Sequence, residues 1–450
     1  MTSPMTAEQM LDDVAQSVLA TAQSVAKGAE VRTDVDRTRA ANVRFARNEM
    51  TTSGEYEEIT VSVSVALGKR QAWTSTNQTD PASIKAMVER AVAMARLAPE
   101  DPETMPLLPP QKYAPAPESY DSTLAAMMPA DRAAIATRAV TAGDREKVQI
   151  AGFFYRNGYQ RVLRSSTGLV AAHHETEAQY TVTARTPDGT GSGWAGRETH
   201  LASDLDDALL SRTAIEKAVR SAKPQAIPAG KYTVILEPQA VAEMMAFLVG
   251  SMDLRHADEG RSYFTGKVGE KLFADWVSLV SDPSDPATPS ATYDGEGMPL
   301  RPQKWIDQGR AKDLHVSRYW GEKKGVPATG HHHVYRLFGE GPNAQAANID
   351  ELVRGTKRGL LVTRFWYNRM LEPQTVMITG LTRDGLYLIE DGKITAPVTN
   401  FRYNESPVTV LKNIDGMTRK TERTPSFAGS WYVPALRTHE FTMASPSAAV

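Results

Sequence analysis

The chain has 450 residues, of which 41% are hydrophobic and 23% charged, a composition typical of globular proteins. Its length predicts two or three domains, because one hydrophobic core rarely supports so long a chain. A formal net charge of −2 disfavours nucleic-acid binding, and the lack of cysteine excludes disulfides and thiolate metal sites. With no signal-peptide pattern and no window of about 18 apolar residues, we expect a cytoplasmic protein that does not enter membranes.

The first predicted domain spans residues 1–98. Residues 6–27 place apolar side chains at helical spacing and begin with a capping-box pattern, so they predict an amphipathic helix. Residues 42–48 predict a strand. Isoleucine and valine alternate with threonine and serine over residues 57–67, which is typical of a half-buried strand. Asp80-Pro81 predicts the start of a second helix.

The second predicted domain spans residues 118–222. Seven prolines in residues 98–117 indicate an extended connection that precedes this domain. The pattern then predicts a helix over 129–142, a hairpin turning at Asn157-Gly158, and a helix over 204–222.

The third predicted domain spans residues 230–450. It opens with a strand over 232–238 and a helix over 239–253, and glycine and proline then interrupt short strands at close spacing. The predicted fold class is α+β, with mixed sheets in the N-terminal α/β region and a mainly antiparallel C-terminal β domain.

Several segments of the third domain follow one another in a recognisable order. The strand and helix of residues 232–253 are followed by the runs R-S-Y-F-T-G-K-V-G-E, Y-D-G-E-G-M-P, P-A-T-G and I-E-D-G-K-I-T-A-P-V, which begin at residues 261, 293, 327 and 389. Each run alone is a weak glycine and proline pattern. In this order they resemble the TldD/PmbA family of metallopeptidases, and the resemblance implies that family's fold.

The resemblance also implies that this chain has lost the metal site. In catalytic members the helix carries H-E-x-x-x-H, but Ala246 and Ser251 stand at the histidine positions and Phe247 stands at the glutamate position. Zinc needs nitrogen, sulfur or oxygen donors at about 2.0–2.3 Å. The family's third ligand is a cysteine, and the corresponding tail, residues 427–433, contains none. We therefore expect no catalytic residue, metal or cofactor in this chain.

The resemblance further implies a partner and a substrate. A metal-free subunit of the PmbA or TldE type forms a heterodimer with a TldD-like catalytic subunit that holds the zinc, and the two enclose a chamber for unstructured peptides. Arg261 and Tyr263 follow the degenerate helix, and His331, His332 and His333 follow the P-A-T-G run. We expect these five residues to bind the peptide.

Three alternatives remain open from the residues alone. His331 and His333 could belong to an unusual ligand set of a metallohydrolase, since alternate residues of a strand share one face. The histidines could also lie in an ordinary surface loop, and the chain could be a stand-alone peptide-binding protein. His173-His174-Glu175 lacks the i, i+4 spacing of helical zinc ligands, and we interpret it as structural.

Overall fold

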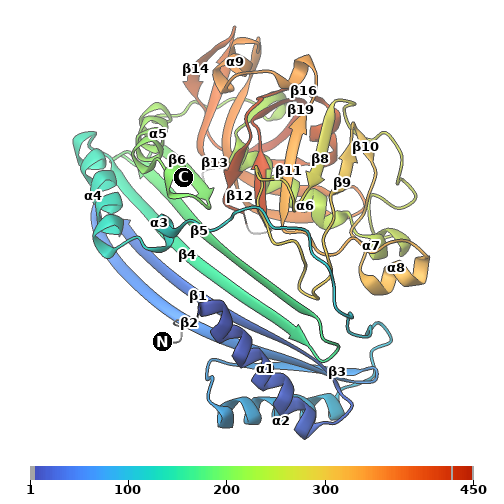
Figure 1. Cartoon of the computed structure of the whole chain (residues 1–450). Helices are drawn as coiled ribbons and strands as arrows, with labels where there is room; N and C mark the ends of the chain where they lie inside the picture. Colours follow the sequence, from blue (N-terminus) through green and yellow to red (C-terminus); the bar gives the residue numbers. More distant parts are fainter. Residues whose placement is uncertain (1–5, 427–428, 448–450) are drawn as a thin grey trace.

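The computed structural model describes residues 6–426 and 429–447, and within these ranges the strands form three sheets. The first is a six-stranded sheet of long strands in the order β3-β2-β1-β4-β5-β6 (Figure 1). Its strands are β1 (Glu30–Ala46), β2 (Glu49–Leu67), β3 (Arg70–Thr76), β4 (Gln149–Ser165), β5 (Val170–Arg185) and β6 (Ser192–Thr199).

The segments predicted as first and second domains share this sheet. Strand β1 pairs with β4 in antiparallel register from Arg32 opposite Ser165 to Phe45 opposite Gly152. Helices cover one face, with α1 and α2 near one end and α4 and α5 near the other (Figure 1). The helices of this half are α1 (Ala7–Val25), α2 (Pro81–Leu97), α3 (Ser122–Ala125), α4 (Pro129–Arg145), η1 (Ala202–Asp204) and α5 (Asp207–Arg220).

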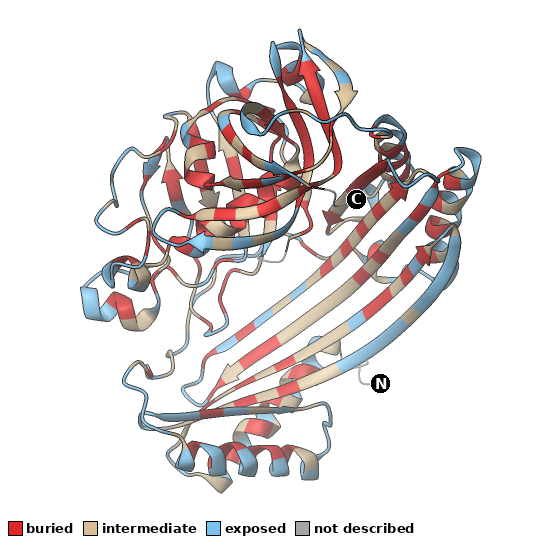
Figure 2. Ribbon diagram, turned by 180° about the vertical axis from the view of Figure 1, so that it is seen from behind, coloured by how far each residue is buried: buried red, intermediate tan, exposed pale blue. Residues whose placement is uncertain are grey.

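Side-chain alternation divides the long sheet into an apolar face and a polar face. Val31 and Val35 of β1 are buried against the helices, whereas Asp34 and Asp36 stand on the opposite face. The C-terminal half of the chain lies on that polar side (Figures 1 and 2). The polar face therefore becomes one wall of the space between the two halves.

The C-terminal half contains two sheets in the orders β10-β9-β8-β11-β18-β17 and β12-β7-β19-β15-β13-β14, with β16 paired to β19. Their strands are β7 (Gly230–Leu236), β8 (Val277–Ser281), β9 (Gln303–Asp307), β10 (Arg310–Ala311), β11 (Val334–Gly339), β12 (Arg358–Glu372), β13 (Met377–Glu390), β14 (Lys393–Pro397), β15 (Phe401–Glu405), β16 (Ile414–Met417), β17 (Glu422–Thr424), β18 (Ser430–Val433) and β19 (Leu436–Pro446). The helices are α6 (Pro238–Ser251), α7 (Leu254–Asp258), α8 (Arg318–Lys324), η2 (Pro342–Ala344), α9 (Ile349–Arg354) and α10 (Pro407–Lys412). The largest hydrophobic core lies around α6.

The α+β class is confirmed, with details that the sequence did not predict. The first sheet is antiparallel throughout, and the parallel pairs, β7 with β12 and β11 with β18, lie in the C-terminal half. The hairpin predicted at Asn157-Gly158 is wrong, because both residues lie inside β4. Strands β1 and β5 pair with β4 on both sides there, and the chain turns instead at residues 166–169.

The helices that begin with clear caps follow the prediction closely. Thr6 and Gln9 form the capping box of α1, and Asp80 accepts hydrogen bonds from the first turn of α2. Within the described ranges, no helix is both long and apolar enough to cross a membrane.

Strand β6 and helix α5 approach each other closely at Gly193. A Cβ atom at Gly193 would lie 2.2 Å from the carbonyl oxygen of Ala214 and 2.4 Å from the amide nitrogen of Ala218. Both are backbone atoms of α5, so they cannot rotate away. Only glycine fits this position without moving the helix from the sheet.

We therefore expect Gly193→Ala to lower the free energy of unfolding by about 1–3 kcal/mol, the range of overpacked cores. Gly250→Ala is the matched control, because no atom lies within 4 Å of a Cβ there and alanine favours a helix by up to about 1 kcal/mol. Thermal melts of both variants would test this. Equal melting temperatures for the two variants would contradict the packing argument.

Candidate functional site

Helix α6 carries the positions that correspond to the metal-binding motif. Pro238 occupies its first turn, and the helix ends at Ser251. Apolar side chains on almost every side bury it between the sheets of the C-terminal half. A helix that is hydrophobic all round belongs in a core. The composition of α6 is therefore that of a helix buried in a hydrophobic core.

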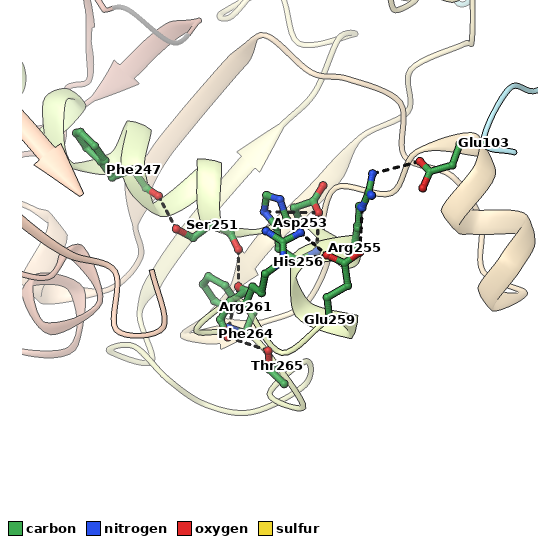
Figure 3. A network of polar contacts seen from close by, with 11 residues as sticks. Glu103, Phe247, Ser251, Asp253, Arg255, His256, Glu259, Arg261, Phe264 and Thr265 are labelled. Carbon is green, nitrogen blue, oxygen red and sulfur yellow. Dashed lines mark hydrogen bonds and ion pairs between the residues drawn. The ribbon is translucent and has the colours of Figure 1, made fainter. Parts of the chain in front are cut away.

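The side chains at the three motif positions offer no metal site. Ala246 and Ser251 are buried, and Phe247 is partly buried against the core. The Ser251 hydroxyl donates to the carbonyl oxygen of Phe247 at 2.9 Å, and its own carbonyl oxygen accepts from the Ser262 hydroxyl at 2.6 Å (Figure 3). A methyl group and a phenyl ring supply no lone pair. The side chains at these positions therefore do not fit the zinc that the H-E-x-x-x-H helix of catalytic TldD/PmbA members holds.

Hydrogen bonds and ion pairs among residues 253–261 stabilise the segment after α6. Asp253 caps α7 by accepting from the His256 amide at 2.9 Å, and Glu259 pairs with both Arg255 and Arg261 (Figure 3). Arg261, one of the predicted peptide-binding residues, lines an open cavity of about 420 Å³ beside Ser251. This cavity lies where α6 ends.

The other predicted binding residue of this segment has a different setting. Tyr263 packs edge-on against Phe264, and the ammonium of Lys267 lies 3.6 Å from the centre of its ring. Burial raises the pKa of the Tyr263 hydroxyl. Tyr263 does not line the cavity that Arg261 lines. The structure thus separates two residues that the sequence treated as one group.

A second cavity, of about 220 Å³, lies between the long sheet and the C-terminal half, and we call it the Glu177 cavity. Tyr159 of β4 stands opposite Glu175 of β5, so alternate side chains of both strands face into the same space. Loops of the C-terminal half, together with residues of β11, β17 and β18, form the other wall. Its titratable lining residues include His173, Glu175, Glu177, His332, His333 and Arg423.

The two glutamates of this cavity have opposite electrostatic character. Burial, together with the nearby charge of Glu198, raises the pKa of Glu177 to about 7. Burial also acts to raise the pKa of Glu175, but a hydrogen bond and the charge of His173 bring it below its ordinary value. The ring nitrogen Nε2 of His173 lies 3.2 Å from that carboxylate. Glu175 is therefore ionised at neutral pH, while Glu177 titrates there.

The histidine cluster lies outside any strand, which corrects the strand geometry assumed for it. Residues 331–333 come just before β11, after a turn in which Gly330 has φ +72°. The rings of His331 and His333 lie 4.6 Å apart, and the amide of His331 donates to Asp294 at 3.3 Å. Across residues 6–426 and 429–447, no group of three histidine, cysteine, aspartate or glutamate side chains could hold a metal ion.

His332 is buried in its uncharged form. Burial lowers the pKa of its imidazole to about 4, and only 3% of the residue is exposed. Its Nε2 atom has no hydrogen-bond partner within the described ranges. His332 and His333 line the Glu177 cavity, whereas Arg261 lies in the other cavity, so the five predicted residues do not form one site.

A buried polar cluster joins α6 to the rest of the molecule, and the sequence analysis missed it. The carboxylate of Glu243 accepts from the Phe365 amide at 2.6 Å and lies 3.9 Å from Arg364. Arg364 in turn stacks over Trp194 of β6. Burial raises the pKa of Glu243 to about 7. A lone glutamate in an apolar helix was the signal that could have revealed this cluster.

Glu177 and Arg423 were also missed, because nothing in the sequence shows that β5 and β17 approach each other. The segment aligned with the family's third ligand begins with residues 427 and 428, which lie outside the described ranges. The residues that the structure does place there, such as Ser430, turn toward Glu198 and Arg423. The region that corresponds to the family's metal site therefore contains polar side chains, but its described residues contain no set of metal ligands.

Comparison with known proteins first identifies the chain as a member of a peptidase family. Models of domain 1, the central domain and the C-terminal domain of the PmbA/TldA metallopeptidases match residues 29–95, 115–222 and 229–445. These matches cover most of the sequence in the family's own order. The chain belongs to the PmbA/TldD metallopeptidase family.

Individual relatives are distant. A metalloprotease PmbA homologue of Haemophilus influenzae is 21% identical, over 79% of this chain and 79% of the relative. A metalloprotease of Methanothermobacter thermautotrophicus is 24% identical, over 56% of this chain and 58% of the relative, so the match spans little more than half of that protein. The crystal structure of TldE from Thermococcus kodakarensis superposes with a TM-score of 0.85 at 18% identity, over 95% of this chain and 99% of the other, and shows a shared fold.

The uncharged state of His332 predicts a pH effect on stability. The pKa of His332 in the folded chain is lower than the pKa of an exposed imidazole, which is about 6.5. As the pH falls, the unfolded chain therefore binds a proton at this residue before the folded chain does. Stability from this group is complete above about pH 6.5 and is lost as the pH falls toward 4, by up to about 3 kcal/mol. Glu177 and Glu243 have raised pKa values in the folded chain, so their contribution to the free energy of unfolding increases as the pH falls.

We expect His332→Gln to reduce the fall in melting temperature between pH 6.5 and pH 4.5. His174→Gln, at an exposed position of β5, is the control. Melts of the three proteins over this pH range would test the expectation. A wild-type slope in His332→Gln would show that His332 does not titrate differently on folding.

Proposed function

We propose that this chain is the non-catalytic subunit of a two-subunit zinc peptidase that degrades or matures unstructured peptides. Its partner is a TldD-like subunit that carries the H-E-x-x-x-H helix and the zinc. In the heterodimer, this chain completes the chamber and binds peptide. It is active only together with that partner.

The set of side chains at the motif positions of α6 carries this proposal. One lost ligand could be replaced by a neighbour, but Ala246, Phe247 and the hydrogen-bonded Ser251 leave neither a zinc ligand nor a base for water. The chain also contains no cysteine for the third ligand. Helix α6 nevertheless packs in the C-terminal core. This supports a role in which the chain contributes binding surface to a complex and takes no part in metal chemistry.

Peptide binding is supported by the polar space between the two halves. The Glu177 cavity brings carboxylates, imidazoles and an arginine together at the surface of a long sheet. Main-chain hydrogen bonds to a sheet edge bind any sequence, so strand addition would suit a subunit that handles unstructured peptides. His331 and His333 offer ring nitrogens near this space as further partners for peptide groups.

Two other functions remain to be separated from this one. A hydrolase with its own ligand set would use His331 and His333, whose rings are close, but no third ligand joins them within the described ranges. A stand-alone peptide-binding protein would bind peptides without assembling with a peptidase. Elemental analysis tests the first alternative, and co-purification from the native host tests the second.

We expect the purified chain to bind no stoichiometric zinc and to leave unstructured peptides intact. Mixed with the H-E-x-x-x-H subunit of its host, it should form a stable complex and support chelator-sensitive cleavage. The partner alone and the mixture inhibited by chelator are the controls. About one tightly bound zinc per chain, or turnover by the chain alone after stringent purification, would overturn the proposal.

Restoring the motif should not restore activity. The triple variant Ala246→His, Phe247→Glu and Ser251→His still lacks the cysteine ligand and the side chains that orient zinc-bound imidazoles. It also places a carboxylate in an apolar setting, so we expect its melting temperature to fall. Ser251→Ala, which removes one hydrogen bond at a cost of about 1 kcal/mol, is the control. A triple variant with parental stability and zinc-dependent turnover would refute this account.

A further inference from the structure

The Glu177 cavity contains several charges, and nearly all of them are already paired. Arg423 donates to Glu198 at 2.8 Å, and Ser430 donates to the same carboxylate at 2.6 Å. Arg161 pairs with Asp34 on the sheet face. Each arginine that lines the cavity therefore has a carboxylate of its own.

Glu177 is the exception. Glu175 on the same strand has the ring of His173 at 3.2 Å, but Glu177 has no hydrogen bond or ion pair within the described part of the chain. Its carboxylate opens onto the cavity, where the neighbouring charges of Glu175 and Glu198 oppose its ionisation and that of Arg423 favours it. An ionised carboxylate in such a place is costly unless a cation approaches it.

Two uncharged polar groups of the same cavity also lack partners. The hydroxyl of Tyr293 and the Nε2 atom of His332 are buried and have no hydrogen-bond partner among residues 6–426 and 429–447, and the two residues are only 5% and 3% exposed. Both line the cavity together with Glu177. Buried polar groups in proteins almost always have a partner, so these two groups are available to hydrogen-bond a ligand that enters the cavity.

We propose that the Glu177 cavity binds a primary ammonium group, with the carboxylate of Glu177 as its counter-ion. An ammonium carries three N–H donors, and Glu177, His332 and Tyr293 offer oxygen or nitrogen acceptors within one space. An anion would instead meet the charges of Glu175, Glu177 and Asp294. A metal ion is disfavoured because the described residues contain no three-ligand set.

The cavity volume limits the size of the ligand. About 220 Å³ equals the space of roughly seven water molecules at about 30 Å³ each, enough for one amino-acid residue or a lysine side chain. The ammonium could therefore come from the amino terminus of a peptide or from a lysine within it. That the ligand is a peptide depends on the proposed function, whereas the choice of an ammonium depends only on the cavity.

The binding test uses the purified full chain alone and calorimetric titration at pH 7.5. Its probes are one unstructured pentapeptide with a single lysine, the same peptide acetylated at the amino terminus, the same peptide acetylated at the lysine, and the same peptide acetylated at both positions. We expect one acetylation to weaken binding at least tenfold, and the sensitive position identifies the source of the ammonium. Equal affinity for the unmodified peptide and for the peptide acetylated at both positions, or no binding of the unmodified peptide at millimolar concentration, would overturn the proposal.

Glu177→Gln tests the counter-ion with almost no change of shape. We expect it to weaken binding of the unmodified peptide at least tenfold, while Glu216→Gln, at an exposed position of α5, binds as the wild type does. Unchanged affinity in Glu177→Gln would overturn the assignment. The peptide acetylations need no variant, so the proposal remains testable even if Glu177→Gln folds poorly.

The pH dependence supplies a further check. Because the pKa of Glu177 is raised to about 7, wild-type affinity should rise several-fold from pH 6 to pH 7.5, and Glu177→Gln should lose this rise. Glu175 has a lowered pKa and stays ionised over this range, and burial lowers the pKa of the His333 imidazole, which favours its neutral form. Ammonium binding is measured on the isolated chain. If no H-E-x-x-x-H subunit assembled with the chain, the proposed function would be refuted, but the measured ammonium binding would still hold.

Discussion

The burial of helix α6 is the constraint on which the rest of the C-terminal half depends. Residues such as Met244, Met245 and Leu248 are fully enclosed, and strands from both C-terminal sheets pack against them. A helix in this position cannot be exchanged for a polar one without losing the core. The apolar side chains Ala246 and Phe247 at the motif positions are compatible with this fold, because they pack with the rest of α6 in the core.

One carboxylate in this apolar helix connects it to the other half of the molecule. Glu243 accepts the Phe365 amide and stands near Arg364, whose guanidinium covers Trp194 of the long sheet. Ser192, beside Trp194, donates to the buried Asp384 of β13 at 2.5 Å. Removing one member of such a cluster leaves an uncompensated charge, which costs far more than the cluster contributes as a whole. The cluster thus fixes where the two halves meet.

The polar cavity is a consequence of that placement. The long sheet exposes acidic and aromatic side chains on the face without helices, and the C-terminal half approaches this face with Arg423 and the histidine loop. The two surfaces carry charges of both signs, and Arg423 of the C-terminal half pairs with Glu198 of the long sheet across the junction. Within the described residues Glu177 has no hydrogen bond or ion pair, and the proposed ammonium would supply its counter-ion.

The local structure was determined largely by the sequence itself. Short-range rules suffice for the capping box at Thr6, the Asp80 cap and the alternating pattern of residues 57–67, because each depends on neighbours within a few positions. The order of glycine and proline motifs likewise indicated the family, and the three residues of α6 indicated a lost metal site. The hairpin at Asn157-Gly158 failed because a favourable turn sequence cannot compete with strands that pair on both sides of it. Only the tertiary structure decided that Glu177, His332 and Tyr293 share a cavity. Glu177 lies more than a hundred residues before the other two in the sequence, and the charge balance that distinguishes it exists only where the long sheet and the C-terminal half meet.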